Sequence, residues 1–430
     1  MTTFLSLSAV LRSLWITLVL VMLSACSNSS TNEGGQQPSD TALFANSDAV
    51  NERFGTRTTR ELSPQVDEAT RAALVRSLNN FSFDLHRAVT NEAPADGSVE
   101  SGYSAAVALA LTSASTGGST YDSLVALLGI DTLPADEVHA AFNDLALKLE
   151  SRTNDDLVLR TANRIFVRPG LDLQTEFLDI ATADFGAPIT EADFAGAAEE
   201  VVAEVNGWVS DQTDGFIPSI VNNFDPGTVF ALLNAIFLDA TWQSDFETKG
   251  DRPFAGLDGN TAEVPSFGGR STFPKLIQEN LTALEIPYGG GELAMLILMP
   301  SDLETYEASL NSDTFNEVVD ALESADIEIT VPNWQLSSEL DLMQLLSPLG
   351  LPANPWNFER LVNGGTSLDI IARQRARIEV DENGTRAAAV TAVAGITSVP
   401  EPLIIDRPFV YALRDRTTGA VLFTGRVVAP

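Results

Sequence analysis

Apolar residues recur at helical spacing along the first half of the chain, starting near residue 66. Pro64 precedes the first such stretch, and Asp67 and Glu68 stand in its first turn, where acidic side chains favour a helix N-terminus. The apolar face of this first predicted helix is formed by Leu74, Leu78, Phe81, Leu85 and Val89. Similar patterns predict further helices at 103–113, 120–128, 138–149, 175–184 and 197–212.

Strand patterns dominate the second half of the chain. The stretch 229–238 is almost wholly apolar and predicts a strand that is buried on both faces. Other apolar or alternating runs predict strands at 293–299, 327–331, 375–380, 409–413 and 421–428. The glycines at 289–291 predict a hairpin turn. No linker-like stretch divides residues 66–430, so helices followed by strands indicate a single α+β domain.

One segment has an unusual pattern for a loop. Residues 379–395 read EVDENGTRAAAVTAVAG, with a turn at Asn383 and Gly384 and then a run dominated by Ala, Val and Thr. Successive residues of a strand point to opposite faces. As a strand, this segment would have one face of small, uncharged residues, namely Thr385, Ala387, Ala389, Thr391, Val393 and Gly395. Such a face fits between two existing strands without a steric or desolvation penalty.

Insertion of this segment into a sheet would release a large free energy. The stretch 385–398 spans on the order of 45 Å when it is extended. Each new ladder hydrogen bond contributes roughly 1 kcal/mol, so full insertion would release on the order of 10 kcal/mol. This is comparable with the stability of a whole domain. The pattern therefore predicts a loop that can become a strand.

The turn and the small residues after it resemble the hinge of the serpins, a family of serine protease inhibitors. The hinge pattern of the family is an acidic residue followed by Gly, Thr or Ser and a run of small residues. It is matched here by Glu382, Asn383, Gly384, Thr385, Arg386, Ala387, Ala388 and Ala389. Other stretches that resemble the family lie at 161–167, 206–217, 233–246 and 403–413.

The resemblance implies an α+β fold with a single serpin domain at 66–430. It implies a large central β-sheet, two further sheets, about eight to nine helices and an exposed reactive-centre loop at about 382–403. It also implies irreversible, suicide-type inhibition of a serine protease. The protease attacks the loop as a substrate, its nucleophile becomes acylated, and the cleaved loop inserts into the central sheet with the protease still attached. The protein itself supplies no catalytic group and is not an enzyme.

The resemblance also assigns roles to individual residues. The hinge comprises Glu382, Gly384, Thr385, Ala387, Ala388 and Ala389, and the breach and shutter regions of the central sheet comprise Trp242, Asn234, Ser101, Ser104 and Gln374. Four positions depart from the family pattern: Gly102 replaces a proline, Gln374 replaces the histidine of many members, Arg386 replaces a glutamate, and Val390 ends the run of small residues one position early. The alternative is a non-inhibitory serpin that acts as a surface binding or structural lipoprotein. Small inward residues at the hinge favour inhibition over this alternative.

The bond that the protease would cleave lies within a short stretch of small and apolar residues. Counting forward from Gly384 by the usual loop length of the family places Ser398 before the bond, whereas counting back from Pro408 places Thr397 there. The bond is therefore Thr397–Ser398 or Ser398–Val399. No Lys or Arg lies between residues 387 and 406, so elastase-, subtilisin- or chymotrypsin-like proteases are the expected targets rather than trypsin.

The net charge of −34 limits the possible partners. Such a charge repels phosphate backbones and argues against binding to nucleic acid or to a heparin-type polyanion. With 44% hydrophobic and 20% charged residues the chain is typical of a folded protein. The acidity favours either general solubility or adaptation to a saline medium, where self-repulsion is screened. We expect a monomer.

The only cysteine, Cys26, follows a short apolar run at 14–23. A run of this length favours a signal peptide over a transmembrane helix. Leu23, Ser24, Ala25 and Cys26 resemble a bacterial lipobox, in which the cysteine is acylated and becomes the first residue. The expectation is a signal peptide at 1–25, a flexible tether at 26–65 and a lipid-anchored protein of the cell envelope. Its expected location is the outer membrane or the extracellular space. An ordinary secretory signal with an incidental cysteine is the alternative.

The sequence contains none of the common catalytic motifs. No nucleophile elbow, zinc-binding H-E-x-x-H, C-x-x-C or phosphate-binding loop occurs. Of the two histidines, His86 lies on the first predicted helix and is expected to be structural, and His139 is expected to be solvated. We therefore expect no hydrolase activity, no metal and no cofactor.

Overall fold

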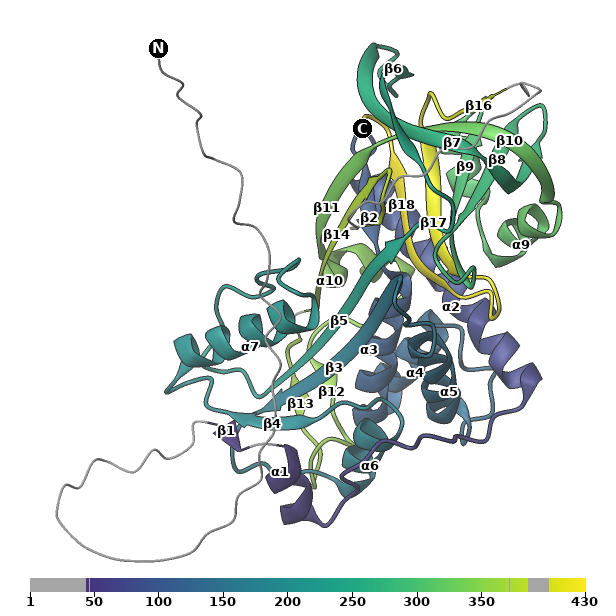
Figure 1. The fold of residues 1–430 in the computed structure, drawn as a ribbon. Helices are drawn as coiled ribbons and strands as arrows, with labels where there is room; N and C mark the ends of the chain where they lie inside the picture. Colours follow the sequence, from purple (N-terminus) through teal and green to yellow (C-terminus); the bar gives the residue numbers. More distant parts are fainter. Residues whose placement is uncertain (1–43, 46, 371, 386–401) are drawn as a thin grey trace, which may run out of the picture. The chain divides into compact units, whose positions relative to one another are not determined.

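A computed structural model describes residues 44–430 except 46, 371 and 386–401 (Figure 1). The described residues contain ten α-helices and one short 3-10 helix, η1 (Ser347–Leu349). The α-helices are α1 (Ser47–Phe54), α2 (Glu68–Glu92), α3 (Gly102–Ser115), α4 (Gly118–Leu127), α5 (Val138–Glu150), α6 (Thr175–Ala183), α7 (Ala198–Gln212), α8 (Leu303–Ser309), α9 (Ser312–Asp320) and α10 (Leu342–Leu346).

The first predicted helix is confirmed as α2. Asp67 caps its N-terminus, because the side chain accepts a hydrogen bond of 2.6 Å from the backbone amide of Thr70. The predicted apolar face is the buried face: Leu74, Leu78, Phe81, Leu85 and Val89 all lie in the core. The five later helices also match their predicted ranges to within two residues at each end.

A seven-stranded sheet crosses the middle of the domain, and we call it the central sheet. Its strands in spatial order are β1 (Phe44–Ala45), β4 (Ile189–Ala192), β3 (Leu157–Val167), β5 (Phe230–Thr241), β15 (Gly384–Thr385), β14 (Arg373–Asp381) and β11 (Trp334–Asp341). Neighbouring strands are antiparallel except β3 and β4, which are parallel.

A second sheet has nine strands, four of which are fully buried. Its strands are β16 (Leu403–Ile404), β10 (Glu323–Pro332), β7 (Thr261–Ile277), β8 (Leu281–Pro287), β9 (Leu293–Pro300), β17 (Phe409–Asp415), β18 (Val421–Val427) and β2 (Ser98–Glu100), with β6 (Glu247–Ala255) paired to β7. Every residue of β8, β9, β17 and β18 is buried. The predicted turn at 289–291 connects β8 to β9. A two-stranded sheet consists of β12 (Trp356–Asn357) and β13 (Ser367–Leu368).

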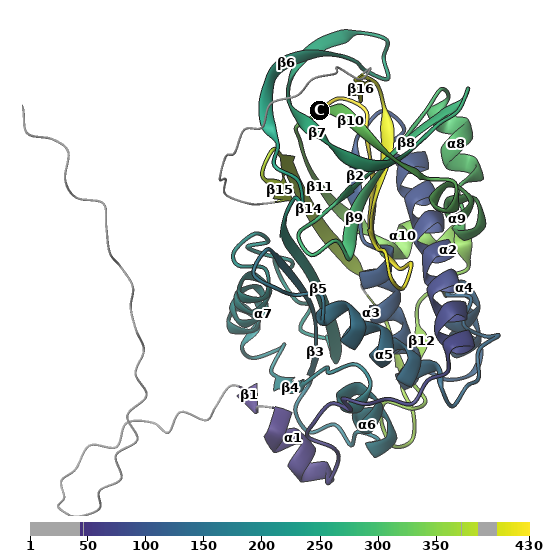
Figure 2. The same ribbon diagram turned by 45° about the vertical axis from the view of Figure 1, so that its right-hand side comes forward.

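Helices cover both faces of the central sheet. Figure 2 shows α7 on one face, which we call the front, and α3 on the opposite face, the back. The prediction that 229–238 forms a strand buried on both faces is wrong in part. Leu233, Ala235 and Phe237 of β5 are buried, whereas Leu232 and Ile236 are only half-buried. The reason is local: on one side of β5 the neighbouring strand is β15, which pairs with only two of its residues.

Residues 44–61 pack on the domain, whereas we expected 26–65 to form a flexible tether. β1 extends the edge of the central sheet beside β4 (Figure 1). Val50 of α1 is buried in the core. Arg53 pairs with Glu191 at 2.7 Å and Arg60 with Glu150 at 2.8 Å. These contacts depend on distant partners, so the polar composition of the segment did not indicate them. The signal peptide predicted at 1–25 and the tether at 26–43 lie outside the described residues.

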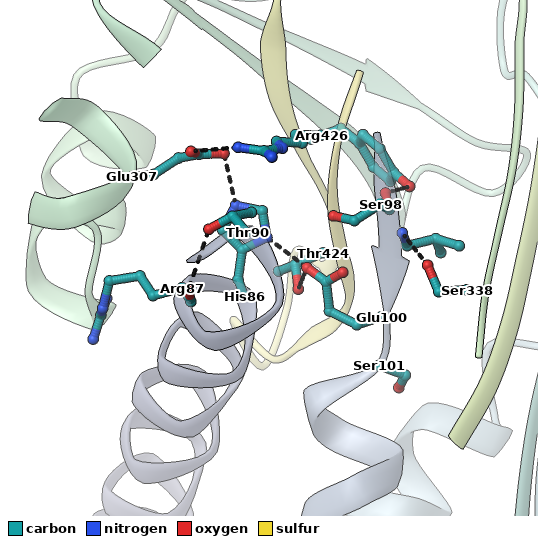
Figure 3. Close-up of polar contacts among 12 residues, drawn as sticks. His86, Arg87, Thr90, Ser98, Glu100, Ser101, Glu307, Ser338, Thr424 and Arg426 are labelled. Carbon is teal, nitrogen blue, oxygen red and sulfur yellow. Dashed lines mark hydrogen bonds and ion pairs between the residues drawn. The ribbon is translucent and has the colours of Figure 1, made fainter. Parts of the chain in front are cut away.

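A buried cluster of charges joins α2, α8, β2 and β18 (Figure 3). His86 contacts Glu100 at 2.5 Å through Nδ1 and Glu307 at 3.2 Å through Nε2, and Arg426 contacts the second oxygen of Glu307 at 3.1 Å. Burial alone would lower the pKa of His86, but the two carboxylates offset this effect and raise the pKa to about 9. The buried ring of His86 is therefore cationic at neutral pH, and the prediction of a structural histidine is confirmed.

Candidate functional site

The predicted hinge begins where β14 ends. The chain turns after Asp381, whose carboxylate accepts a hydrogen bond of 2.8 Å from the amide of Asn383, and returns as β15. Gly384 pairs with Asp381 on one side and with Thr241 of β5 on the other. Thr385 likewise pairs with Val380 and Ala240. Gly384 and Thr385 of the predicted loop thus already form a strand inside the central sheet.

Only glycine fits at position 384. Its φ is +144°, a backbone conformation that L residues rarely adopt. A Cβ at this position would lie 2.1 Å from the carbonyl oxygen of Ala240 and 2.8 Å from the Cα of Thr241. The glycine of the hinge pattern is therefore required by the close approach of β5.

Two stacked aromatic rings hold this hinge. Trp242 follows β5 and Tyr288 follows β8, and their rings lie 4.5 Å apart at an angle of 8°. The indole of Trp242 donates to the carbonyl oxygen of Asp381 at 2.8 Å, and its backbone amide donates to that of Asn383 at 3.3 Å. The hydroxyl of Tyr288 lies 2.6 Å from that of Thr385, and both side chains are buried. Trp242 and Tyr288 therefore hold both the turn at 381–383 and strand β15 in place.

The N-terminus of α3 contacts both strands that flank β15. On the β14 side, the side-chain amide of Gln374 accepts from the backbone amide of Ser101 at 3.0 Å and donates to its carbonyl at 2.8 Å. On the β5 side, the hydroxyl of Ser104 donates to Asn234, which in turn donates to Asn163 of β3 at 2.7 Å. The structure brings together the four predicted shutter residues.

Gln374 is a neutral side chain at a position where, by the family resemblance, many serpins have an ionisable histidine. Its amide pairs with one backbone amide and one carbonyl, as a strand neighbour would. This contact does not depend on protonation near neutral pH.

The segment that follows α7 crosses the front of the sheet from β5 to β14. Phe216 packs edge-on against Phe237 of β5, and the guanidinium of Arg377 on β14 lies 4.8 Å from the centre of the Phe216 ring. Arg375 donates to the carbonyl oxygen of Ser219 at 2.7 Å. A strand that entered between β5 and β14 would have to displace this segment.

Strand β15 fills only a short part of the space between β5 and β14 in the central sheet. Among the described residues, β5 pairs with β3 and β15, and β14 pairs with β11 and β15. The two flanking strands therefore have no ladder in common except through the two residues of β15. A longer strand in this place would satisfy backbone groups on both sides.

Several predicted positions lie outside the described residues. These are the hinge residues Ala387, Ala388 and Ala389, the reactive-bond residues Thr397, Ser398 and Val399, and Cys26. Glu382 is described, and it accepts a hydrogen bond of 3.3 Å from the hydroxyl of Thr248.

Sequence reasoning missed Tyr288 and Asn163, which contact the hinge and the shutter. Tyr288 stands next to three glycines, and this position gave only a turn signal. Nothing in the local pattern distinguishes either residue from ordinary core and strand residues.

His139 differs from its prediction. We expected a solvated side chain, but the ring is half-buried against Phe185, with 5.6 Å between ring centres, and its Nδ1 atom has no partner within the described residues. Burial lowers its pKa to about 4. Across the described residues no group of three or more His, Cys, Asp or Glu side chains could hold a metal ion. None of the helices in this part of the chain is long and apolar enough to span a membrane.

Comparisons with known proteins agree with this geometry. A sequence model of the family "Serpin (serine protease inhibitor)" matches residues 76–430. An uncharacterized serpin-like protein of Thermococcus kodakarensis is 30% identical over 380 residues, which cover 85% of this chain and 88% of that protein. The leukocyte elastase inhibitor of Sus scrofa is 30% identical over 371 residues, which cover 81% of this chain and 97% of the inhibitor.

Solved structures of the family have the same fold. The native state of tengpin, a thermophilic serpin, superposes with a TM-score of 0.78 at 24% identity and covers 90% of this chain and all of that one (100%). Human thyroxine-binding globulin superposes with a TM-score of 0.76 at 26% identity, with 84% and 99% of the two chains covered. The chain belongs to the serpin family. It has the α+β serpin fold, and the family as a whole is described as serine protease inhibitors.

Proposed function

We propose that this serpin is an irreversible, suicide-type inhibitor of serine proteases. The observation that carries the proposal is β15: Gly384 and Thr385 already occupy the place between β5 and β14 that the cleaved loop would fill. Residues 386–398 follow directly in sequence and would extend this strand toward the other end of the sheet.

The inward side chains of the extended strand suit this place. Thr385 is buried beside Tyr288, and the residues at every second position after it are small and uncharged. If each new backbone hydrogen bond contributes roughly 1 kcal/mol, insertion of ten or so residues releases enough free energy to distort an attached protease. The uncleaved protein is then a metastable state that is maintained by kinetics.

The bait sequence supports a particular class of target. Ile396, Thr397, Ser398 and Val399 are small or apolar, and the porcine relative is by name an inhibitor of leukocyte elastase. A trypsin-like pocket contains a buried carboxylate, which would remain unpaired against such residues. The proposed targets are elastase-, subtilisin- or chymotrypsin-like proteases.

The proposed location is the cell envelope. Acylation of Cys26 would anchor the chain, and the net charge of −34 argues against a nucleic-acid or heparin-type partner. The proposed active form is a lipid-anchored monomer.

The test of inhibition is a gel assay with a hinge variant. The wild-type protein should form a covalent complex with an elastase-like protease that survives boiling in detergent. Thr385→Arg places a charge in the buried position beside Tyr288, at a cost of several kcal/mol if it is unpaired. This variant should be cleaved without trapping the protease.

A matched control is Thr261→Arg, which places the same side chain on an exposed position at the start of β7. It should trap the protease as the wild type does. Equal trapping by Thr385→Arg and the wild type would contradict insertion as the mechanism.

A further inference from the structure

Within the described part of the loop, Tyr288 contacts Thr385, whose side chain lies inside the central sheet before cleavage. Its hydroxyl lies 2.6 Å from that of Thr385, and 0% of the Tyr288 side chain and 5% of Thr385 are exposed. No water competes for a hydrogen bond at such burial, so the bond holds the two side chains in one arrangement. Burial also raises the pKa of Tyr288, so its hydroxyl stays protonated and able to donate.

Tyr288 itself cannot move away easily. Its ring stacks on Trp242 at 4.5 Å, and its backbone forms a bridge with that of Trp242. Trp242 is tied in turn to the carbonyl oxygens of Asp381 and Asn383 in the turn that leads into β15. The hydroxyl of Tyr288 is thus a fixed point against which Thr385 is placed.

The position of Thr385 determines the register of everything that follows it. Side chains alternate along a strand, so a slip of one residue would turn Arg386 and the other outward residues toward the core. With Thr385 fixed, the small residues point inward as the strand lengthens. Fixing the first residue also removes the search for a starting position, which leaves less time for the acylated protease to be released by hydrolysis.

We propose that Tyr288 is a positioning residue for loop insertion, whose hydroxyl holds Thr385 in the central sheet before cleavage and thereby sets the register and speed of insertion. This inference rests on the proposed inhibitory function. After cleavage the acylated protease is either trapped by insertion or released by hydrolysis, and we call the ratio of these two outcomes the partition. Without the hydroxyl, more of the cleaved inhibitor should be released without trapping a protease.

The partition is measured as the moles of inhibitor consumed for each mole of protease inactivated. Tyr288→Phe removes only the hydroxyl and should raise the excess of this ratio over one about fivefold, the change expected for one hydrogen bond. Tyr411→Phe is the matched control. Tyr411 is also buried and donates through its hydroxyl, but to the carbonyl oxygen of Ser98 at 2.9 Å and not to the hinge. Its ratio should remain that of the wild type.

Variants of the partner residue separate positioning from a general loss of stability. Thr385→Val removes the same hydrogen bond from the other side and keeps the shape, and Thr385→Ser restores a hydroxyl. The double variant with Tyr288→Phe and Thr385→Val should be no worse than either single variant, because both remove one shared bond. Additive effects would show that the two residues act separately. Thr385→Ser should behave as the wild type.

A second readout does not require a protease. Amide hydrogen exchange of the peptide that contains 381–385 should be slow in the wild type and about fivefold faster in Tyr288→Phe and Thr385→Val, but unchanged in Tyr411→Phe. If the wild type traps no protease at all, the proposed function fails, but the exchange data still test the contact. If both hinge variants retain the exchange rate and the partition of the wild type, the positioning role of Tyr288 is refuted.

Discussion

Gly384→Ala is the smallest change that should separate cleavage of the loop from its insertion. The added Cβ would lie 2.1 Å from the carbonyl oxygen of Ala240, whereas ordinary contacts begin at 3.4 Å. The hinge would therefore have to move away from β5 by more than 1 Å. The φ of +144° adds a strain of roughly 1–3 kcal/mol for an L residue. This strain is similar to what the hydrogen bonds of a two-residue strand contribute, so β15 should be lost.

The clash remains after cleavage, because the inserted strand passes through the same position. We expect Gly384→Ala to be cleaved at the wild-type rate but to trap severalfold less protease in a denaturing gel. The control is Gly207→Ala in α7, where nothing lies within 4 Å of an added Cβ and φ is not strained. Alanine favours a helix interior, so this control should trap normally and should not lose stability. Trapping by Gly384→Ala with wild-type efficiency would refute the reasoning.

Four further predictions concern other parts of the molecule. The folded-state pKa of His86, about 9 against 6.5, predicts stability that is complete below pH 6.5 and lost as the pH rises through 9, by about 3 kcal/mol. Thermal melts of the wild type should show this slope and those of His86→Gln should not. Arg60→Ala should lower the melting temperature by several degrees, because it removes the Nη1 group that donates to both carboxylate oxygens of Glu150, and an unchanged melting temperature would contradict the packing of residues 44–61 on the domain. The native protein should incorporate labelled fatty acid and Cys26→Ala should not, so equal labelling would exclude the lipid anchor. Trypsin should be inhibited weakly by the wild type and more strongly by Ser398→Arg, and strong inhibition of trypsin by the unmodified chain would contradict the assigned bait.

Local sequence patterns predicted elements whose partners are close or whose faces are uniform. The period of α2 followed directly from its apolar residues, and the serpin resemblance led to the large central sheet. Strand β11 was not predicted although its residues alternate between buried and exposed, because Ser338 interrupts the apolar residues of its inward face. The half-buried residues of β5 could not be predicted either, since they depend on how far β15 extends.

In the candidate site, too, some residues could be identified from the sequence and some contacts could not. Gly384 and Thr385 could be identified from the sequence because the turn at Asn383 and Gly384 and the small residues after it match the hinge pattern of the serpins. The contact of Tyr288 with Thr385 joins residues 97 positions apart, and the contact of Arg60 with Glu150 joins residues 90 positions apart. Such pairs are determined by the packing of whole elements, so no local pattern contains them.

The most direct test of the account is the mass of the complex with an elastase-like protease. After incubation and denaturation, we predict a covalent species with the mass of the protease plus the inhibitor up to residue 397 or 398. A released peptide should begin at Ser398 or Val399 and end at Pro430. This result would show cleavage of the bait with the acyl bond still intact. An inhibitor that is cleaved between 395 and 400 but never found attached to the protease, or a complex that dissociates on denaturation, would contradict the claim that insertion traps the acylated enzyme.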